Sequence, residues 1–267
     1  MSRHEFLRHL HVLAAPRTYL EIGVNDGRSL ALSRTSSIAI DPAFRITVPL
    51  RCNLDLVRAT SDDFFAGPDP LAHFRGILGA AAGGTGDGDG AADAGVRPLI
   101  DLAFIDGMHH FEFALRDFMN VERHADWWSL IVFDDMLPRS VAEAARDRHS
   151  REWAGDVFKI VPVLARHRPD LILVPVDTAP TGVLVVLGAD PANDVLRERY
   201  EEIVAEWVVP DPQLVPPATL GREGAFDPEA LLESGIWPGL VRARLAATPR
   251  EPGCELVRQR LATVTHR

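Results

Sequence analysis

The chain has 267 residues, which fits one large domain or one domain with an appendage. Its formal net charge of −10 argues against a large phosphate-binding surface, because nucleic acids are bound by clustered Lys and Arg. No apolar run is long enough to cross a bilayer, and the first residues lack the apolar core of a signal peptide. We therefore expect a cytoplasmic protein with neither a nucleic acid nor a membrane as partner. Its two cysteines, Cys52 and Cys254, form no CxxC pair and are expected to be reduced.

The chain begins with a predicted helix and then alternates between strands and helices. Residues 2–13 have an apolar face, with Ser2 and Glu5 at the spacing of a capping box. A strand at 18–22 runs into a glycine turn at 23–27, and residues 28–33 can open a helix. Further strands are expected at 37–40, 54–59, 101–105, 130–133, 171–176 and 183–187, with a polar turn at 60–63 and helices at 111–124 and 157–167.

This alternation predicts an α/β fold, namely a Rossmann-like, doubly wound sheet of seven mostly parallel strands. The strands are solid apolar runs, as expected when both faces of a sheet are covered by helices. Only a short turn, 177–182, separates the last two strands, which favours an antiparallel hairpin and hence a terminal antiparallel strand.

Two segments fall outside this pattern. Residues 79–96 are rich in Gly, Ala and Asp, and we expect a flexible insertion, because such a segment buries too little apolar surface. We place the main domain at 1–190 and a helical or irregular C-terminal extension at 191–267. The extension could cover the active site, form a contact in a homo-oligomer, or simply pack on the core.

The first glycine turn has the pattern E-x-G-x-x-x-G, from Glu21 to Gly27. It differs from the G-x-G-x-x-G of dinucleotide enzymes. The next strand ends at Asp41, which lies 20 positions after Glu21, and an acidic residue there can accept hydrogen bonds from ribose hydroxyls. Taken alone, Gly23 and Gly27 could form an ordinary strand-to-helix turn.

Two acidic motifs follow neighbouring strands. The strand at 101–105 runs into Asp106-Gly-Met-His109-His110, and the strand at 130–133 runs into Asp134-Asp135. Adjacent strand ends lie about 5 Å apart, so the three carboxylates are expected to converge, and a hard divalent cation would relieve their repulsion. The alternatives are that Asp134 and Asp135 cap a helix or form a turn, and that the histidine at 109 is structural.

These motifs together resemble class I S-adenosylmethionine (SAM)-dependent methyltransferases, and the I-D-G-x-H-H and V-F-D-D segments resemble the metal-dependent macrocin-type sugar O-methyltransferases. The resemblance covers about residues 15–190 and implies SAM and Mg²⁺, or another divalent cation, as cofactors. It implies metal binding by Asp106, Asp134 and Asp135, and a general base at His109, with His110 as the rival. The cofactor-binding residues implied are Glu21, Gly23, Asn25, Gly27, Asp41, Ser61, Asp62 and Asp106.

The expected reaction is therefore methylation of a hydroxyl on a small molecule such as a sugar or polyketide. A non-catalytic module that binds SAM or a nucleoside on the same fold is the alternative. A dinucleotide oxidoreductase is disfavoured by the glycine spacing, and a nucleic-acid methyltransferase by the acidic charge. Three side chains are left over: Trp127 and Trp128 are expected in the core, and Lys159 in solvent unless it meets an acidic substrate group.

Overall fold

A computed structural model describes residues 1–75, 77 and 97–266 of the chain. The insertion predicted at 79–96 lies outside the described residues, so its expected flexibility stays a prediction. The longest helices that the structure describes have 12 residues, and no helix in these parts of the chain could span a bilayer.

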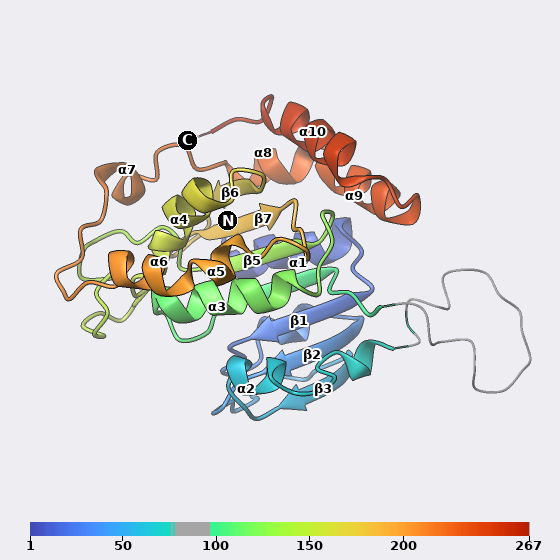
Figure 1. The fold of residues 1–267 in the computed structure, drawn as a ribbon, viewed down its shortest axis with the longest axis horizontal. Coiled ribbons are helices and arrows are strands. Elements are labelled where there is room, and N and C mark those ends of the chain that lie inside the picture. Colours follow the sequence, from blue (N-terminus) through green and yellow to red (C-terminus); the bar gives the residue numbers. More distant parts are fainter. Residues whose placement is uncertain (76, 78–96, 267) are drawn as a thin grey trace, which may run out of the picture.

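Seven short strands form one sheet (Figure 1). They are β1 (Thr18–Ile22), β2 (Ser36–Ile40), β3 (Asn53–Val57), β4 (Leu102–Ile105), β5 (Leu130–Asp134), β6 (Ile172–Val176) and β7 (Val183–Leu187). Their order is β3-β2-β1-β4-β5-β7-β6, with β1 to β5 parallel and β7 antiparallel to both of its neighbours. The predicted mostly parallel α/β sheet is confirmed. The antiparallel strand is last in the chain but lies inside the sheet, so that β6 forms the edge.

One face of the sheet packs on the helices that follow β3 and later strands. Alternate strand residues such as Ala103 and Ile105 belong to this apolar cluster, together with Phe111, Phe118 and Leu164 from the helices. The elements on this side are α2 (Ser61–Phe65), η2 (Ala72–Phe74), α3 (Phe111–Glu122), η4 (Val157–Lys159), α4 (Ile160–His167), α5 (Val195–Glu198) and α6 (Tyr200–Trp207).

The opposite face packs on the two ends of the chain. Leu102 and Phe104, which alternate with the residues of the first cluster, belong to a second apolar cluster. This cluster also contains Phe6 and Leu10 from the N-terminal helix and Trp237 from the C-terminal extension. The elements on this side are α1 (Arg3–Leu13), η1 (Leu30–Leu32), α8 (Pro228–Glu233), α9 (Ile236–Leu245) and α10 (Arg250–Leu261), while α7 (Pro217–Leu220) lies in the connecting stretch. The expected helices on both faces are therefore present.

Two local predictions are wrong. The helix expected at 28–33 is a single 3₁₀ turn, η1, because α1 already covers this part of the sheet and Ser29 turns its hydroxyl inward to Glu21. The polar turn expected at 60–63 is the start of α2, where the Thr60 side chain accepts a hydrogen bond from the Asp63 amide as an N-cap.

Candidate active site

The candidate site lies at the C-terminal edge of the parallel strands, where open α/β sheets bind their ligands. Because β1, β4 and β5 are neighbours in the sheet, the loops that follow them meet at this edge. The loop after β4 carries Asp106 and His109, and the loop after β5 begins with Asp135. The topology thus brings the two acidic motifs together, as their spacing predicted.

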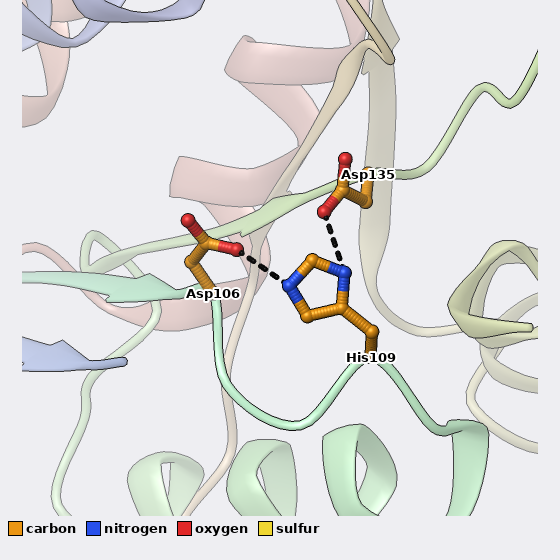
Figure 2. A group of neighbouring side chains, drawn as sticks. All are labelled: Asp106, His109 and Asp135. Carbon is orange, nitrogen blue, oxygen red and sulfur yellow. Dashed lines mark ion pairs between the residues drawn. The ribbon is translucent and has the colours of Figure 1, made fainter. Parts of the chain in front are cut away.

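Asp106, His109 and Asp135 form a compact cluster of two carboxylates and one imidazole (Figure 2). Nε2 of His109 lies 3.3 Å from Oδ1 of Asp106, and Nδ1 lies 3.0 Å from Oδ2 of Asp135. One potential ligand atom from each residue lies within 4.8 Å of the other two. The imidazole therefore bridges two carboxylates that come from neighbouring strands.

The ring and the carbonyl oxygen of Trp153 hold the His109 ring in place. The two rings stack with centroids 4.9 Å apart and planes 6° apart, and Nδ1 of His109 lies 3.0 Å from the Trp153 carbonyl oxygen. His109 itself has a left-handed backbone with φ of 57°. Gly155 packs so closely that an added Cβ would lie 1.7 Å from the His109 carbonyl oxygen. The orientation of the imidazole is thus fixed by backbone and ring contacts together.

The two carboxylates favour the protonated form of this imidazole. Burial by itself lowers the pKa of His109, but the hydrogen bond to Asp106 and the charges of Asp135 and Asp106 outweigh burial and raise the pKa to about 9. At neutral pH the ring therefore carries a proton in this arrangement. A general base must be neutral before it accepts a proton, so the catalytic role of His109 stays a prediction.

Asp135 is fixed from its other side by the turn between β6 and β7. The hydroxyl of Thr181 in that turn donates a hydrogen bond to Oδ1 of Asp135. Burial raises the pKa of the Asp135 carboxyl to about 6, against the opposing effect of the His109 charge. In the described chain β5 leads into an irregular loop and not into a helix, so the helix-cap alternative for Asp134 and Asp135 is wrong.

The Asp134 carboxylate pairs with a residue outside the acid–imidazole cluster. The Asp134 side chain is 1% exposed and contacts the guanidinium of Arg3, which also lies 3.7 Å from Oδ2 of Asp106. Adjacent residues at the end of a strand direct their side chains differently, which separates Asp134 from Asp135. Asp134 is therefore outside the acid–imidazole cluster. It nevertheless lines, together with the three residues of that cluster, a small hollow between the loops after β4 and β5.

The cluster has the donor types of a divalent cation site. Carboxylate oxygens suit Mg²⁺, and a neutral imidazole suits several transition metals. Asp106 and Asp135 could hold a cation once His109 is neutral, whereas Asp134 could join them only if Arg3 moved away. The predicted ligand set of Asp106, Asp134 and Asp135 stays a prediction.

His110 lies outside the cluster. It is the N-cap residue of α3, and its Nε2 lies 3.1 Å from the carbonyl oxygen of Arg146. The geometry therefore favours His109 over His110 as the imidazole beside the carboxylates.

The glycine loop adjoins the cluster directly. Gly23 has φ of 88°, and a Cβ at this position would lie 1.9 Å from the carbonyl oxygen of Asp106. Gly27 has φ of 84° and packs on the Ile46 side chain, whereas Asn25 is exposed. Both glycines are thus required by the protein's own packing, and Asn25 is the side chain of this loop that is open to a ligand.

Asp41, after β2, closes the glycine loop. Its Oδ2 accepts hydrogen bonds from the amides of Val24 (2.9 Å) and Asn25 (2.8 Å), and its Oδ1 accepts one from the amide of Ala43. The predicted ribose-binding carboxylate therefore also fixes the loop on which the nucleoside is expected to lie.

Glu21 faces the interior. It has no exposed surface, and its carboxylate accepts hydrogen bonds from the hydroxyls of Tyr19 (2.6 Å) and Ser29 (2.7 Å). Burial raises the pKa of Glu21 to about 8 although both hydrogen bonds lower it. The predicted cofactor contact of Glu21 has no support from this geometry.

Ser61 and Asp62 lie at the start of α2 and are tied to α3. The Ser61 hydroxyl donates to Oδ1 of Asp117 at 2.5 Å, and Asp62 pairs with Arg116 at 2.8 Å. Asp117 is almost fully buried, and burial raises the pKa of its carboxyl to about 7. Their predicted contact with the adenine of the cofactor stays a prediction.

Several supporting residues were not predicted from the sequence. Lys159, expected in solvent, is buried and pairs with Asp156 at 2.8 Å, and Oδ1 of Asp156 accepts a hydrogen bond from the first amide of α3. Asp156 also pairs with Arg146. The segment Trp153–Lys159 therefore holds both the His109 ring and the start of α3, and its run of Trp, Gly, Asp and Lys was the one available signal.

Similarity to known proteins is weak in both sequence and structure. No protein-family model and no curated protein matches the chain. The chain is similar to the O-methyltransferase from Bacillus cereus in complex with SAH, at 12% identity over 69% of this chain and 80% of that chain, with a TM-score of 0.44. It is similar to the O-methyltransferase TomG from Streptomyces achromogenes in complex with SAM, at 15% identity over 69% and 78%, with a TM-score of 0.44. A third similar structure is the N-methyltransferase NodS from Bradyrhizobium japonicum, at 13% identity over 69% and 92%, with a TM-score of 0.36. Likeness at this level says nothing about the reaction, which has to be inferred from the site.

Proposed function

We propose that this chain is a SAM-dependent methyltransferase that acts on a hydroxyl of a small molecule with the help of a divalent cation. The observation that carries the proposal is the contact between the two halves of the site, which are the glycine loop and the acid–imidazole cluster. Gly23 of the glycine loop touches the backbone of Asp106, which belongs to the acid–imidazole cluster. A nucleoside on the loop would therefore place its reactive end beside the carboxylates.

The nucleoside half of the site would be built by the loops after β1, β2 and β3. Asn25 is exposed on the glycine loop, Asp41 is fixed beside it, and Ser61 lies at the start of α2. SAM, when bound there, would supply a methyl group on a positively charged sulfur. The role of these residues is to orient that group toward the cluster, because catalysis of methyl transfer depends mainly on positioning.

The cluster would handle the acceptor hydroxyl. A cation held by Asp106 and Asp135 would lower the pKa of a hydroxyl bound beside it. His109 is the proton acceptor. It can accept the hydroxyl proton only when the negative charge of Asp106 and Asp135, which keeps its own proton bound, has been compensated. Trp153 and Gly155 keep its ring between the two carboxylates.

A non-catalytic SAM-binding module on the same fold is the second candidate. The observation in its favour is that Arg3 and protonated His109 compensate two of the three carboxylate charges without any added cation. Such a module would bind the nucleoside and transfer no methyl group.

Calorimetry with S-adenosylhomocysteine tests the cofactor half of the proposal. We expect the wild type to bind it, and Asp41→Ala to weaken binding at least about tenfold because the glycine loop loses its anchor. Asp55→Ala, which changes an exposed aspartate of β3, is the matched control and should bind as the wild type does. A wild type that shows no binding heat would exclude SAM chemistry.

Transfer of a labelled methyl group tests the catalytic half. The full chain is incubated with methyl-labelled SAM and a panel of phenols and sugars, in Mg²⁺ and in chelator. We expect Mg²⁺-dependent labelling of at least one hydroxyl compound, reduced at least about tenfold in Asp135→Asn. Cofactor binding without labelling of any compound would favour the non-catalytic module, and full labelling in chelator would exclude the cation.

A further inference from the structure

The N-terminal segment is fastened to the edge of the sheet that carries the acidic residues. The Ala179 amide donates a hydrogen bond to the Met1 carbonyl oxygen (2.9 Å), and the Arg3 amide donates one to the Ala179 carbonyl oxygen (3.0 Å). Ser2 and Glu5 then start α1 with a complete capping box. Arg3 is therefore held at a fixed place beside the cluster and is not part of a loose tail.

The same turn that binds the N-terminal segment also fixes the cluster. Thr181, two residues after Ala179, donates a hydrogen bond to Asp135, and its carbonyl oxygen accepts one from the Leu137 amide. Arg222 in turn binds the carbonyl oxygens of Thr178 and Pro180. A displacement of the N-terminal segment would therefore also move the turn that fixes Asp135.

The Arg3 guanidinium compensates the most buried carboxylate of the site. It contacts Asp134, whose side chain is 1% exposed, and lies 3.7 Å from Asp106. Among the described residues, no donor makes a hydrogen bond of normal geometry to either Asp134 oxygen, so the ion pair with Arg3 is what offsets the burial of this charge. Removing the cationic partner of a buried ion pair leaves an uncompensated negative charge, which favours binding of another cation.

A positive charge of the chain itself already lies among the carboxylates. Asp106, Asp134 and Asp135 contribute three carboxylates, and the Arg3 guanidinium contacts Asp134 and lies 3.7 Å from Asp106. A divalent cation entering between these carboxylates would be repelled by the Arg3 guanidinium. The Arg3 side chain is 25% exposed and long, so it can withdraw into solvent while its backbone stays in place.

We infer that Arg3 is a built-in competitor of the divalent cation and sets the affinity of the site for it. Binding of the cation and pairing of Arg3 with Asp134 oppose each other, so each weakens the other by the same factor. Withdrawal of Arg3 frees Asp134 to join Asp106 and Asp135 as a ligand. This inference rests on the cation site of the proposed function, but not on SAM or on methyl transfer.

Binding of Mn²⁺, measured by electron paramagnetic resonance of the free ion, tests this inference on the full chain. We expect Arg3→Ala and Arg3→Gln to bind Mn²⁺ about tenfold or more tightly than the wild type, within the usual range of coupling between two sites. Arg8→Ala is the matched control, because Arg8 lies on the same helix but is exposed, and it should bind as the wild type does. Arg3→Lys retains the charge and should stay close to the wild type.

Two further measurements separate competition from a general loosening of the site. Adding Asp134→Asn to Arg3→Ala should remove the gain in affinity if Asp134 is the ligand that Arg3 withholds. In the wild type, Mg²⁺ should shift the NMR signal of the Arg3 guanidinium, which leaves Asp134 when the cation binds, while the signal of the exposed Arg8 stays unchanged.

The inference is overturned if both folded Arg3 variants bind Mn²⁺ no more tightly than the wild type, or if no variant binds it at all. Calorimetry with S-adenosylhomocysteine on the same samples keeps the two proposals apart. A wild type that binds the nucleoside while Arg3→Ala shows no gain refutes the role of Arg3 alone, whereas a gain without nucleoside binding refutes only the proposed methyltransferase.

Discussion

Glu21 is an acidic side chain at the end of β1 with no exposed surface. Burial raises its pKa from 4.5 to about 8, so the folded protein keeps the proton that an unfolded chain would release. Because the folded pKa is the higher one, the stabilising effect of this group is complete below about pH 4.5 and is lost as pH rises toward 8.

Glu21→Gln should therefore remove a part of the pH dependence of stability. The free energy of unfolding of the variant, relative to the wild type, should rise between pH 5 and pH 9 by several kcal/mol, on the order of 1.4 kcal/mol per pH unit in the window where only the unfolded chain is ionised. Denaturant unfolding at a series of pH values measures this difference. The exposed substitution Glu198→Gln is the control. A constant difference across the series would mean that Glu21 is already ionised in the folded protein.

At the scale of single residues, the sequence predicts which motifs meet but not how each side chain turns. The spacing of Asp106, His109 and Asp135 placed them at neighbouring strand ends, and the structure brings them together. Asp134 was grouped with Asp135, although consecutive side chains leave a strand in different directions. The partner of Asp134 is Arg3, more than a hundred residues away, and no local pattern could reveal that pair.

At the scale of elements, every strand of the sheet was predicted to within two residues. Most strands are buried apolar runs with a simple hydrophobic signature, whereas β3 has the sequence NLDLV and contains no buried residue. The helix expected at 28–33 fails for a tertiary reason, since α1 fills the face that such a helix would cover. The support of His109 by residues 153–159 was not predicted for a related reason. Trp153 and Gly155 contact a loop that lies more than forty residues earlier in the chain.

Gly155→Ala tests this supporting segment. A Cβ here would meet the His109 carbonyl oxygen at 1.7 Å, so the loop after β4 must shift, and both stability and Mn²⁺ binding should fall. We expect a loss of about 2–4 kcal/mol in the free energy of unfolding, from strain and overpacking together. Gly224→Ala is a matched control, because Gly224 also has positive φ but has nothing within 4 Å. Equal losses in the two variants would show that backbone strain alone, and not the contact with His109, explains the effect.

At the scale of the whole molecule, the sheet is a central layer between helices from different parts of the chain. The extension expected after residue 190 divides between the two faces, with α6 on one side and α8 to α10 on the other. The helix α10 docks on Trp127, whose indole Nε1 donates a hydrogen bond to the Thr248 carbonyl oxygen at 2.7 Å. Gly253 of α10 faces that indole, and Arg250 binds the carbonyl oxygen of Gly188 after β7. These contacts predict that the extension unfolds together with the sheet and not as a separate unit.

Two glycine-to-alanine substitutions in neighbouring helices test this docking. A Cβ on Gly253 would lie 2.2 Å from the Trp127 ring, so Gly253→Ala should push α10 off the sheet and lower the free energy of unfolding by about 1–3 kcal/mol. Gly239 of α9 has nothing within 4 Å of an added Cβ, so Gly239→Ala should raise it by about 0.5–1 kcal/mol through the better helix propensity of alanine. Denaturant unfolding followed by tryptophan fluorescence gives both values, and hydrogen exchange shows where protection is lost. If Gly253→Ala lowers protection in α9 and α10 alone while the sheet keeps its full stability, the extension is an independent unit. If β4 and β5 lose protection as well, the Trp127 contact joins the extension to the strands that carry the candidate site.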